Sequence, residues 1–222
     1  MTAALIILGS YLIGAVPVAY LAGRALGGVD LRAEGSGNVG ASNVWQSVSR
    51  AAVVPVGLAE IGQGLAGIMI AKAADESLGV QAGAGLAAIA GHNWSVFLGL
   101  TGGRGIGHAM GFMLVLSWPG LGAFTGLSLI GVALRAVPQF VGVGVLTAPL
   151  AALAKGQATA IVAGLGGVAG LVVAKRLLAN RPLLPFDAES RRVLVYRLLY
   201  DRDTREREAW VRGHKGGVRW RS

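Results

Sequence analysis

Apolar runs, each about as long as a membrane-crossing helix, fill most of this chain. Such a helix needs roughly 20 apolar residues, and only 14% of the residues here are charged, against about 25% in soluble domains. The pattern predicts an all-α integral membrane protein with about seven transmembrane helices. The first run has no basic stretch before it, so we expect a retained helix and not a signal peptide. The expected spans are about 3–23, 52–71, 80–99, 107–118, 120–134, 138–154 and 158–178.

The middle of the chain leaves the number of helices open. Residues 107–154 form one long apolar stretch, which is interrupted at Trp118–Gly120 and between Arg135 and Pro138. Proline and glycine break helices, and a lone arginine prefers a helix end. These interruptions favour seven spans, with five as the alternative if the middle region is re-entrant.

Basic residues gather on one side of the predicted membrane. If the N-terminus lies outside, the inner connections carry the loop arginines, whereas the outer connections carry only Lys72 and Lys155. Cytoplasmic loops of membrane proteins are enriched in Lys and Arg. We therefore expect a multi-pass plasma-membrane protein whose C-terminus lies in the cytoplasm.

The C-terminal part of the chain is strongly basic. Thirteen of the 20 Lys and Arg residues lie from Lys175 onward, and the net charge is +9. Acids, bases and apolar residues of 187–210 recur at helical spacing, which predicts an amphipathic helix at the membrane surface. A basic tail beside a membrane span favours membrane lipid as its partner and not nucleic acid. We divide the chain into a membrane domain, 1–184, and a cytoplasmic basic tail, 185–222, of which 213–222 is expected to be disordered.

The first glycine-rich segment, residues 34–44, is polar and lies between the first two spans on the inner side. Glycines let backbone N–H groups converge, and hydroxyl and amide side chains add further donors, so this composition suits an anion-binding loop. An ordinary flexible loop is the simpler alternative. The candidate residues are Ser36, Gly37, Asn38, Gly40 and Asn43.

The second glycine-rich segment, residues 99–107, joins the third and fourth expected spans on the same side. An arginine among glycines just before a helix start can clamp a phosphate group. No soluble strand–turn–helix unit surrounds these glycines, so a dinucleotide site is not expected. The candidate residues are Gly102, Gly103, Arg104 and Gly105.

Three polar side chains lie inside expected spans. Glu60 and Gln63 share one helix face, and a carboxylate in the membrane marks a site because its burial is costly. Arg104 or Arg50 is the expected partner of Glu60, although a structural helix–helix contact would also explain it. His92 has no carboxylate placed to orient it as a base and more often represents a helix–helix hydrogen bond.

Several other chemistries are not supported by the sequence. The chain contains no cysteine and shows no metal-ligand spacing or standard nucleophile motif, so we expect neither a metal nor a cofactor. A transporter would need paired charges within the spans, and only Glu60 lies deep in one.

The two glycine-rich segments resemble signatures of the bacterial membrane glycerol-3-phosphate acyltransferases that use acyl phosphate. Residues 36–43, Ser-Gly-Asn-Val-Gly-Ala-Ser-Asn, are similar to S-G-N-x-G-A-T-N. Residues 91–105 are similar to G-H-x-W-P-V-F-x-G-F-K-G-G-K-G. The order and spacing of both motifs match across about residues 5–184.

This resemblance implies a seven-helix enzyme of the bacterial plasma membrane with its N-terminus outside and its active face in the cytoplasm. It implies acyl transfer from acyl phosphate to the 1-hydroxyl of glycerol 3-phosphate, giving lysophosphatidic acid for phospholipid biosynthesis. Two phosphorylated substrates suit two glycine-rich loops on one face. Acyl phosphate is already activated, so positioning and charge stabilisation can drive the reaction without a protein nucleophile.

The resemblance also assigns roles to individual residues. The implied catalytic residues are Ser36, Asn38, Arg104 and Asn180. The implied substrate-binding residues are Gly37, Gly40, Asn43, Gln46, Glu60, Gln63, His92, Gly102, Gly103 and Gly105.

Several cations of the family pattern are replaced in this chain. Gln46 and Gln63 stand where the family has Arg and Lys, Leu177 and Leu183 stand where it has His and Arg, and Arg104 replaces a Lys. Each charged hydrogen bond to phosphate contributes roughly 1.5–3 kcal/mol, so losing three would weaken binding by several orders of magnitude. A catalytically impaired member that binds lipid or an active partner is therefore the alternative.

Overall fold

The computed structural model describes residues 2–180 and 187–205, and this part of the chain is helical without a strand. Its elements are α1 (Thr2–Ala15), α2 (Val18–Gly27), α3 (Ala41–Ser47), α4 (Val53–Ala73), α5 (Leu78–Asn93), the 3₁₀ helix η1 (Val96–Leu98), α6 (Ile106–Leu116), α7 (Trp118–Ala133), α8 (Val137–Ala154), α9 (Thr159–Leu178) and α10 (Ala188–Tyr200). The expected disorder of 213–222 lies outside the described residues.

A helix or helix pair occupies each expected span. Four of them are long and apolar enough to cross a membrane, namely the α1–α2 unit, α4, α8 and α9, whereas α6 and α7 are shorter apolar helices. The all-helical class is thereby confirmed for the described residues, and four helices have the length and apolar composition that an integral membrane protein requires. The count of seven crossings stays a prediction.

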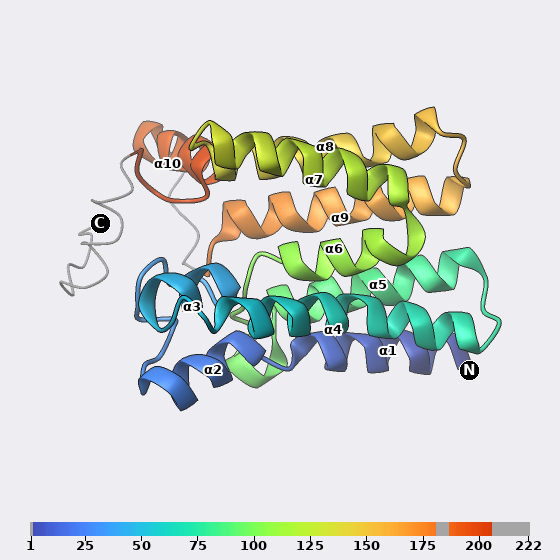
Figure 1. Ribbon diagram of the computed structural model, residues 1–222, viewed down its shortest axis with the longest axis horizontal. Coiled ribbons are helices and arrows are strands. Elements are labelled where there is room, and N and C mark those ends of the chain that lie inside the picture. The colour runs from blue at the N-terminus through green and yellow to red at the C-terminus, as the bar shows by residue number, and fades with distance from the viewer. Residues whose placement is uncertain (1, 181–186, 206–222) are drawn as a thin grey trace.

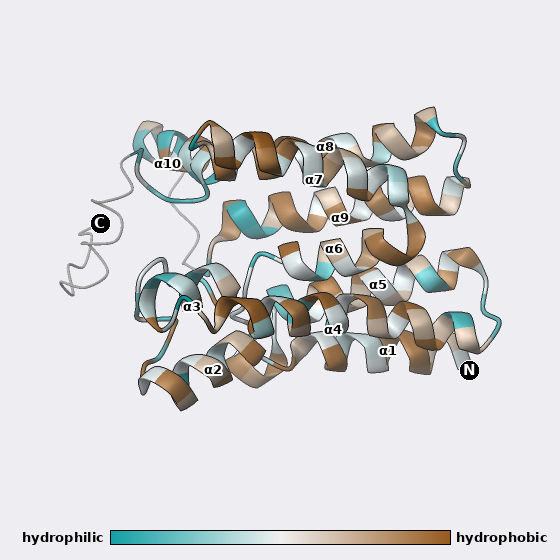
Figure 2. Cartoon of the chain, in the orientation of Figure 1, coloured by the Kyte–Doolittle hydropathy of each residue, from teal (hydrophilic) through white to brown (hydrophobic). Residues whose placement is uncertain are grey.

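The helices run side by side in a bundle (Figure 1), with α7 and α8 along one side, α9 and α6 in the middle, and α5, α4 and α1 along the other side. Both glycine-rich segments, the α7–α8 turn and α10 lie at one end of the bundle, and the N-terminus lies at the other. Figure 2 shows apolar colour along the helices and polar colour mainly in the connections and α10. The inner connections predicted from charge thus share one end of the molecule.

Small residues allow several helices to approach closely. A methyl group on Gly14 would lie 2.0 Å from the carbonyl oxygen of Ala88, and one on Gly91 would lie 2.1 Å from that of Tyr11, so α1 and α5 touch through their backbones. A methyl group on Gly64 would lie 2.3 Å from the carbonyl oxygen of His108, which joins α4 to α6 in the same way. Such contacts stabilise helices in lipid, where no hydrophobic force drives them together.

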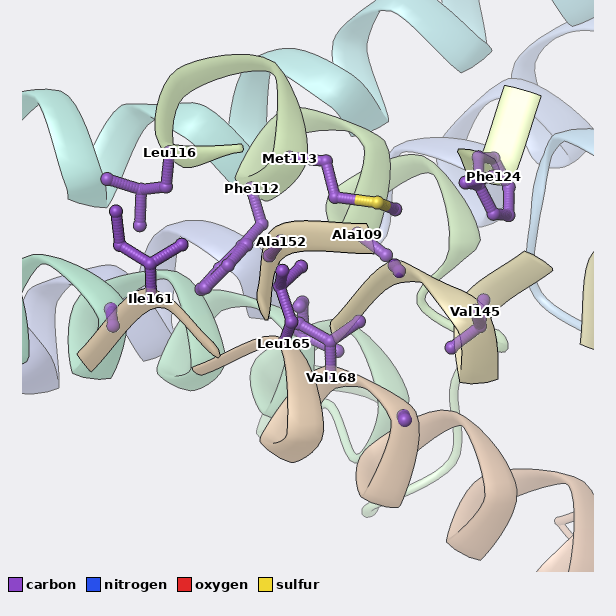
Figure 3. Close-up of a cluster of buried hydrophobic side chains, with 14 of the residues drawn as sticks. Ala109, Phe112, Met113, Leu116, Phe124, Val145, Ala152, Ile161, Leu165 and Val168 are labelled. Atoms are coloured by element: carbon purple, nitrogen blue, oxygen red, sulfur yellow. The ribbon is translucent and has the colours of Figure 1, made fainter. Parts of the chain in front are cut away.

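The main core lies between α6 and α9 and extends to α5, α7 and α8. Figure 3 shows Phe112, Met113, Leu165 and Val168 directed toward one another, and all four are buried. This packing holds the start of α6 and the end of α9 in place, and both helix ends carry predicted site residues.

The first span contains a break that the sequence analysis did not predict. Proline has no N–H group, so Pro17 cannot satisfy the carbonyl of Ile13 four residues earlier. The side-chain amide of Gln63 donates instead to the carbonyl oxygens of Ile13, at 2.7 Å, and Val16, at 3.0 Å. Gln63 therefore bridges α4 to the junction of α1 and α2.

Two further boundaries differ from expectation. The span expected to reach residue 99 ends as an α-helix at Asn93, and η1 and a turn follow it. The end of the first glycine-rich segment forms the short helix α3, although a loop was expected there. The N–H at the start of α3 donates to the carboxylate of Glu60, and the hydroxyl of Ser95 accepts from the N–H of Phe97 in the turn that follows α5. Hydropathy does not reveal such contacts.

Candidate active site

The side chain of Asn43 organises the first glycine-rich segment. It is fully buried, and its amide donates to the carbonyl oxygens of Leu31, at 3.1 Å, and of Glu34 and Asn38, both at 3.0 Å. Its own oxygen accepts from the hydroxyl of Ser47 at 3.1 Å. These contacts fold the segment around Asn43, and the amide has little capacity left for a ligand.

The polar groups of Ser36 and Asn38 lie within this folded segment. The hydroxyl oxygen of Ser36 accepts from the backbone N–H of Asn38 at 3.4 Å. Gly35 and Gly37, on either side of Ser36, have φ values of 57° and 67°, which favour glycine. Within residues 2–180 and 187–205, the side-chain oxygen of the buried Asn38 has no hydrogen-bond partner. This oxygen is therefore an acceptor that the described residues leave unused.

Glu60 connects the first segment to the second. Its carboxylate accepts from the backbone N–H of Ala41 at 3.2 Å and so caps the start of α3. A methyl group on Gly107 would lie 3.0 Å from the same carboxylate. Among the described residues, neither Arg104 nor Arg50 forms an ion pair with Glu60, so the expected ion pair is wrong. A backbone N–H at a helix start replaces the arginine.

The two glycine-rich segments touch at Gly103. A methyl group there would lie 2.0 Å from Nε2 of His92 and 2.6 Å from the carbonyl oxygen of Val39. The backbone N–H of Gly103 donates to the carbonyl oxygen of His92 at 3.1 Å. A methyl group on Gly102 would lie 2.0 Å from that same oxygen. The glycines therefore allow a close backbone approach that no other residue permits.

His92 lies next to this contact, and its ring packs against that of a second histidine, His108. The ring centroids of His92 and His108 are 4.3 Å apart, and both side chains are buried. Within the part of the chain that the structure describes, neither ring nitrogen of His108 has a hydrogen-bond partner. The ring of His92 therefore packs between Gly103 of the second segment and the ring of His108.

Asn180 binds the second segment from the end of α9. Its side-chain oxygen accepts from the N–H of Gly102 at 3.1 Å, and its amide donates to the carbonyl oxygen of Gly102 at 2.8 Å. Ala179 and Asn180 both have positive φ values, 51° and 54°. This left-handed turn costs free energy for non-glycine residues, and it directs the amide of Asn180 onto Gly102.

Arg104 is buried beside the same turn. Its Nη1 donates to the carbonyl oxygen of Lys175 at 3.1 Å. Its Nε lies 2.6 Å from a carboxylate oxygen of Asp201, which follows α10. This N–O contact is short enough for an ion pair, but its geometry is not that of a hydrogen bond. The guanidinium is therefore held by a backbone carbonyl and faces a carboxylate from the tail.

Of the four positions where an expected cation is replaced, Gln46 and Gln63 make hydrogen bonds to backbone carbonyl groups, and Leu183 lies outside the described residues. Gln46 is exposed and donates to the carbonyl oxygen of Ser42 at 3.2 Å, and Gln63 serves the α1–α2 junction as described above. The neighbour of Lys175, Arg176, donates to the carbonyl oxygens of Pro138 and Leu198, both at 2.9 Å. Arg176 therefore attaches α10 to the bundle.

Two charged residues at this site were not singled out from the sequence. Lys175 was counted only as the first of the basic C-terminal residues, and Asp201 only as one acid of the amphipathic tail. The sequence offered no clear signal for Lys175, because a lysine at the end of an apolar span ordinarily extends to the membrane surface, and its burial is visible only in the structure. The contact of Asp201 depends on how α10 docks, which hydropathy does not encode.

These contacts form one continuous group at one end of the bundle. It runs from Asn38 and Glu60 through Gly103 and His92 to Asn180 and Arg104. Its cations and polar side chains suit phosphate ligands. Among the described residues, no group of three or more histidines and acids is placed to hold a metal ion.

The sequence matches one family along most of its length. Residues 4–180 match the family described as glycerol-3-phosphate acyltransferase. The glycerol-3-phosphate acyltransferase of Synechococcus sp. (strain CC9902) is 40% identical over 171 residues, which cover 77% of this chain and 85% of that protein. Glycerol-3-phosphate acyltransferase 4 of Dehalococcoides mccartyi (strain CBDB1) is 33% identical over 219 residues and covers 94% of each chain.

The fold is similar to solved structures of PlsY, described as an integral membrane glycerol 3-phosphate acyltransferase. Its glycerol 3-phosphate form aligns with a TM-score of 0.70 at 28% identity, covering 82% of this chain and 94% of that one. Its lysophosphatidic acid form aligns with a TM-score of 0.68 at 25% identity over the same shares. The family match ends at residue 180, so α10 lies beyond it.

Proposed function

Because this chain belongs to the glycerol-3-phosphate acyltransferase family, we propose that its two glycine-rich segments bind the phosphate groups of acyl phosphate and glycerol 3-phosphate. The chain is a membrane acyltransferase that acts on glycerol 3-phosphate. The observation that carries the site assignment is the contact between the two segments at Gly103, which brings both motifs to one end of the bundle.

The proposed reaction is a direct acyl transfer. The 1-hydroxyl oxygen of glycerol 3-phosphate attacks the carbonyl carbon of acyl phosphate, and the bond between that carbon and the phosphate oxygen breaks. The hydroxyl proton passes to a phosphate oxygen, so the products are lysophosphatidic acid and inorganic phosphate. Since the donor is already activated, the protein mainly has to hold the two reactants in contact and stabilise developing charge.

Several residues are suited to hold the phosphates. Arg104 supplies a guanidinium, and the side-chain oxygen of Asn38 is free to accept a substrate hydroxyl. Ser36 supplies a hydroxyl next to Asn38. Asn180 and Asn43 are proposed to act mainly by holding the two segments, because their amides already bind backbone groups.

We further propose that the helices cross the bacterial plasma membrane seven times and that the site opens to the cytoplasm. The inner connections carry Arg32, Arg50, Arg104 and Arg135, and they lie at one end of the bundle. The positive-inside rule places this end in the cytoplasm.

In the connection before the first glycine-rich segment, Arg32 donates a hydrogen bond to the carboxylate of Asp30 at 2.7 Å, and this contact lowers the pKa of the Asp30 carboxyl group below its ordinary value.

A complementation experiment tests this function against a catalytically impaired protein. The chain is expressed in a bacterial strain whose own glycerol-3-phosphate acyltransferase is conditionally depleted, beside the Arg104→Ala variant. We expect growth with the wild-type chain and none with the variant at equal membrane levels. Failure of the wild-type chain to restore growth, although it is present in the membrane, would favour the impaired alternative.

A further inference from the structure

Lys175 is a buried cation at the edge of the proposed active site. Its side chain is only 1% exposed, although lysine is almost never fully buried without a partner. The ammonium donates to the side-chain oxygen of Asn180 at 2.6 Å and lies 5.3 Å from the centre of the Trp94 ring. Both contacts are with neutral groups.

Within the described residues, no acid forms an ion pair with this ammonium. The carboxylates of Asp30, Asp201 and Asp203 pair with arginines instead. The charged side chain that does approach Lys175 is Arg104, which is also a cation. Burying an ammonium costs several kcal/mol unless an opposite charge compensates for it. Lys175 and Arg104 are thus two buried cations, and the partly exposed Asp201 supplies one carboxylate, which pairs with Arg104. An additional anion would therefore be stabilised between them.

The ammonium is fixed against the second glycine-rich segment. The side-chain oxygen of Asn180 accepts from Lys175 and from the N–H of Gly102, and the side-chain amide of Asn180 donates to the carbonyl oxygen of Gly102. Asn180 therefore links Lys175 to the second glycine-rich segment. An ammonium has three donors, and the contact with Asn180 uses one of them. The remaining donors are available to oxygen atoms of a ligand held by this segment.

From this geometry we infer that Lys175 is a substrate-binding residue that contacts a substrate phosphate together with Arg104. The inference rests on the proposed function and adds a charge that the family resemblance does not assign. Gln46 and Gln63 replace two expected cations, and Lys175 approaches the second segment from α9. The phosphate belongs to glycerol 3-phosphate or to acyl phosphate, since both carry the same group.

The decisive variant is Lys175→Gln. Glutamine still donates a hydrogen bond toward Asn180 but carries no charge, so the structural contact is kept and only the proposed phosphate contact is removed. Lys175→Arg keeps the charge. Lys155→Gln is the matched control, because Lys155 is exposed in the α8–α9 connection at the opposite end of the bundle.

Steady-state rates are measured with purified protein while glycerol 3-phosphate and acyl phosphate are varied separately. In Lys175→Gln we expect KM for one substrate to rise about 10- to 100-fold, as expected for one lost charged hydrogen bond, while KM for the other stays unchanged. The substrate whose KM rises identifies the phosphate. Lys175→Arg should recover most of the affinity, and Lys155→Gln should match the wild type. Unchanged KM values for both substrates in Lys175→Gln, with an active wild type, would overturn the inference and leave the proposed function intact.

A binding measurement separates failure of the inference from failure of the enzyme. Glycerol 3-phosphate and inorganic phosphate are titrated into the purified wild type and the three variants, and the unfolding midpoint is recorded. A bound ligand raises this midpoint, and we expect the shift to disappear in Lys175→Gln only. An equal shift in Lys175→Gln and wild type would refute the phosphate contact even if no turnover occurs. If Lys175→Gln does not fold, the inference is tested with Lys175→Arg. This variant keeps the charge, so the absence of a ligand-induced shift in its unfolding midpoint would contradict a role for that charge.

Discussion

Replacing Gly103 by alanine tests whether the close contact of the two glycine-rich segments is needed for activity. The added methyl group would lie 2.0 Å from Nε2 of His92 and 2.6 Å from the carbonyl oxygen of Val39. Ordinary van der Waals contact begins at 3.4 Å, so the Val39 oxygen must retreat by 3.4 − 2.6 = 0.8 Å. The imidazole of His92 must also move, but a side chain yields more easily than a backbone.

The expected loss of kcat follows from this displacement. A misplacement of about 1 Å in an active site costs on the order of 100-fold in rate, so we expect kcat to fall by roughly that factor. Overpacking a buried contact costs about 1–3 kcal/mol of stability, which leaves the helical bundle folded. The expected result is therefore a folded protein with strongly reduced turnover.

The assay measures lysophosphatidic acid formation by purified Gly103→Ala together with its unfolding midpoint in detergent. Gly126→Ala is the control, because a methyl group on Gly126 in α7 meets open space. We expect wild-type turnover from the control. Wild-type turnover from Gly103→Ala as well would refute the argument that the segments must touch.

Three further changes have clear expected outcomes. Asn43→Ala removes the five side-chain hydrogen bonds of Asn43 in and around the first segment and should lower the free energy of unfolding by about 2–4 kcal/mol; an unchanged denaturation midpoint would contradict this. Asp201→Asn removes the carboxylate beside Arg104 and should lower KM for a phosphate-bearing substrate by about two- to fivefold, the range for a partly exposed ion pair; a raised KM would show that Asp201 positions Arg104 productively instead. This cysteine-free chain can carry single cysteines at Lys72 or Arg50, and an impermeant thiol reagent should label only position 72 in intact cells. Labelling of position 50 alone would reverse the topology.

The sequence predicted the helices well because hydropathy largely determines where a chain crosses lipid. It did not predict the break at Pro17, since a single proline within an apolar run does not reveal whether a partner satisfies the freed carbonyl. The amide of Gln63 does so from another helix. α3 was missed for a similar reason, because the carboxylate that caps its start comes from Glu60, 19 residues further along the chain.

Local motifs were enough to single out the two glycine-rich segments as a candidate site, whereas contacts from distant elements were missed. Gly102 and Gly103 were singled out from the sequence as candidate substrate-binding residues, and that role stays a prediction. The structure adds a packing reason for these glycines, which is their close approach to His92 and Val39. No motif indicated that Asn43 would direct its amide inward to three carbonyl groups. Nor did it place Lys175 beside Asn180, because the left-handed turn at the end of α9 brings them together.

The central claim is that this chain transfers an acyl group from acyl phosphate to glycerol 3-phosphate. The most direct test incubates the purified protein with acyl phosphate and labelled glycerol 3-phosphate, beside an active family member and Arg104→Ala. We predict labelled lysophosphatidic acid from the wild-type chain and none from the variant. Absence of product from the folded wild-type chain, while the control enzyme is active, would contradict the claim.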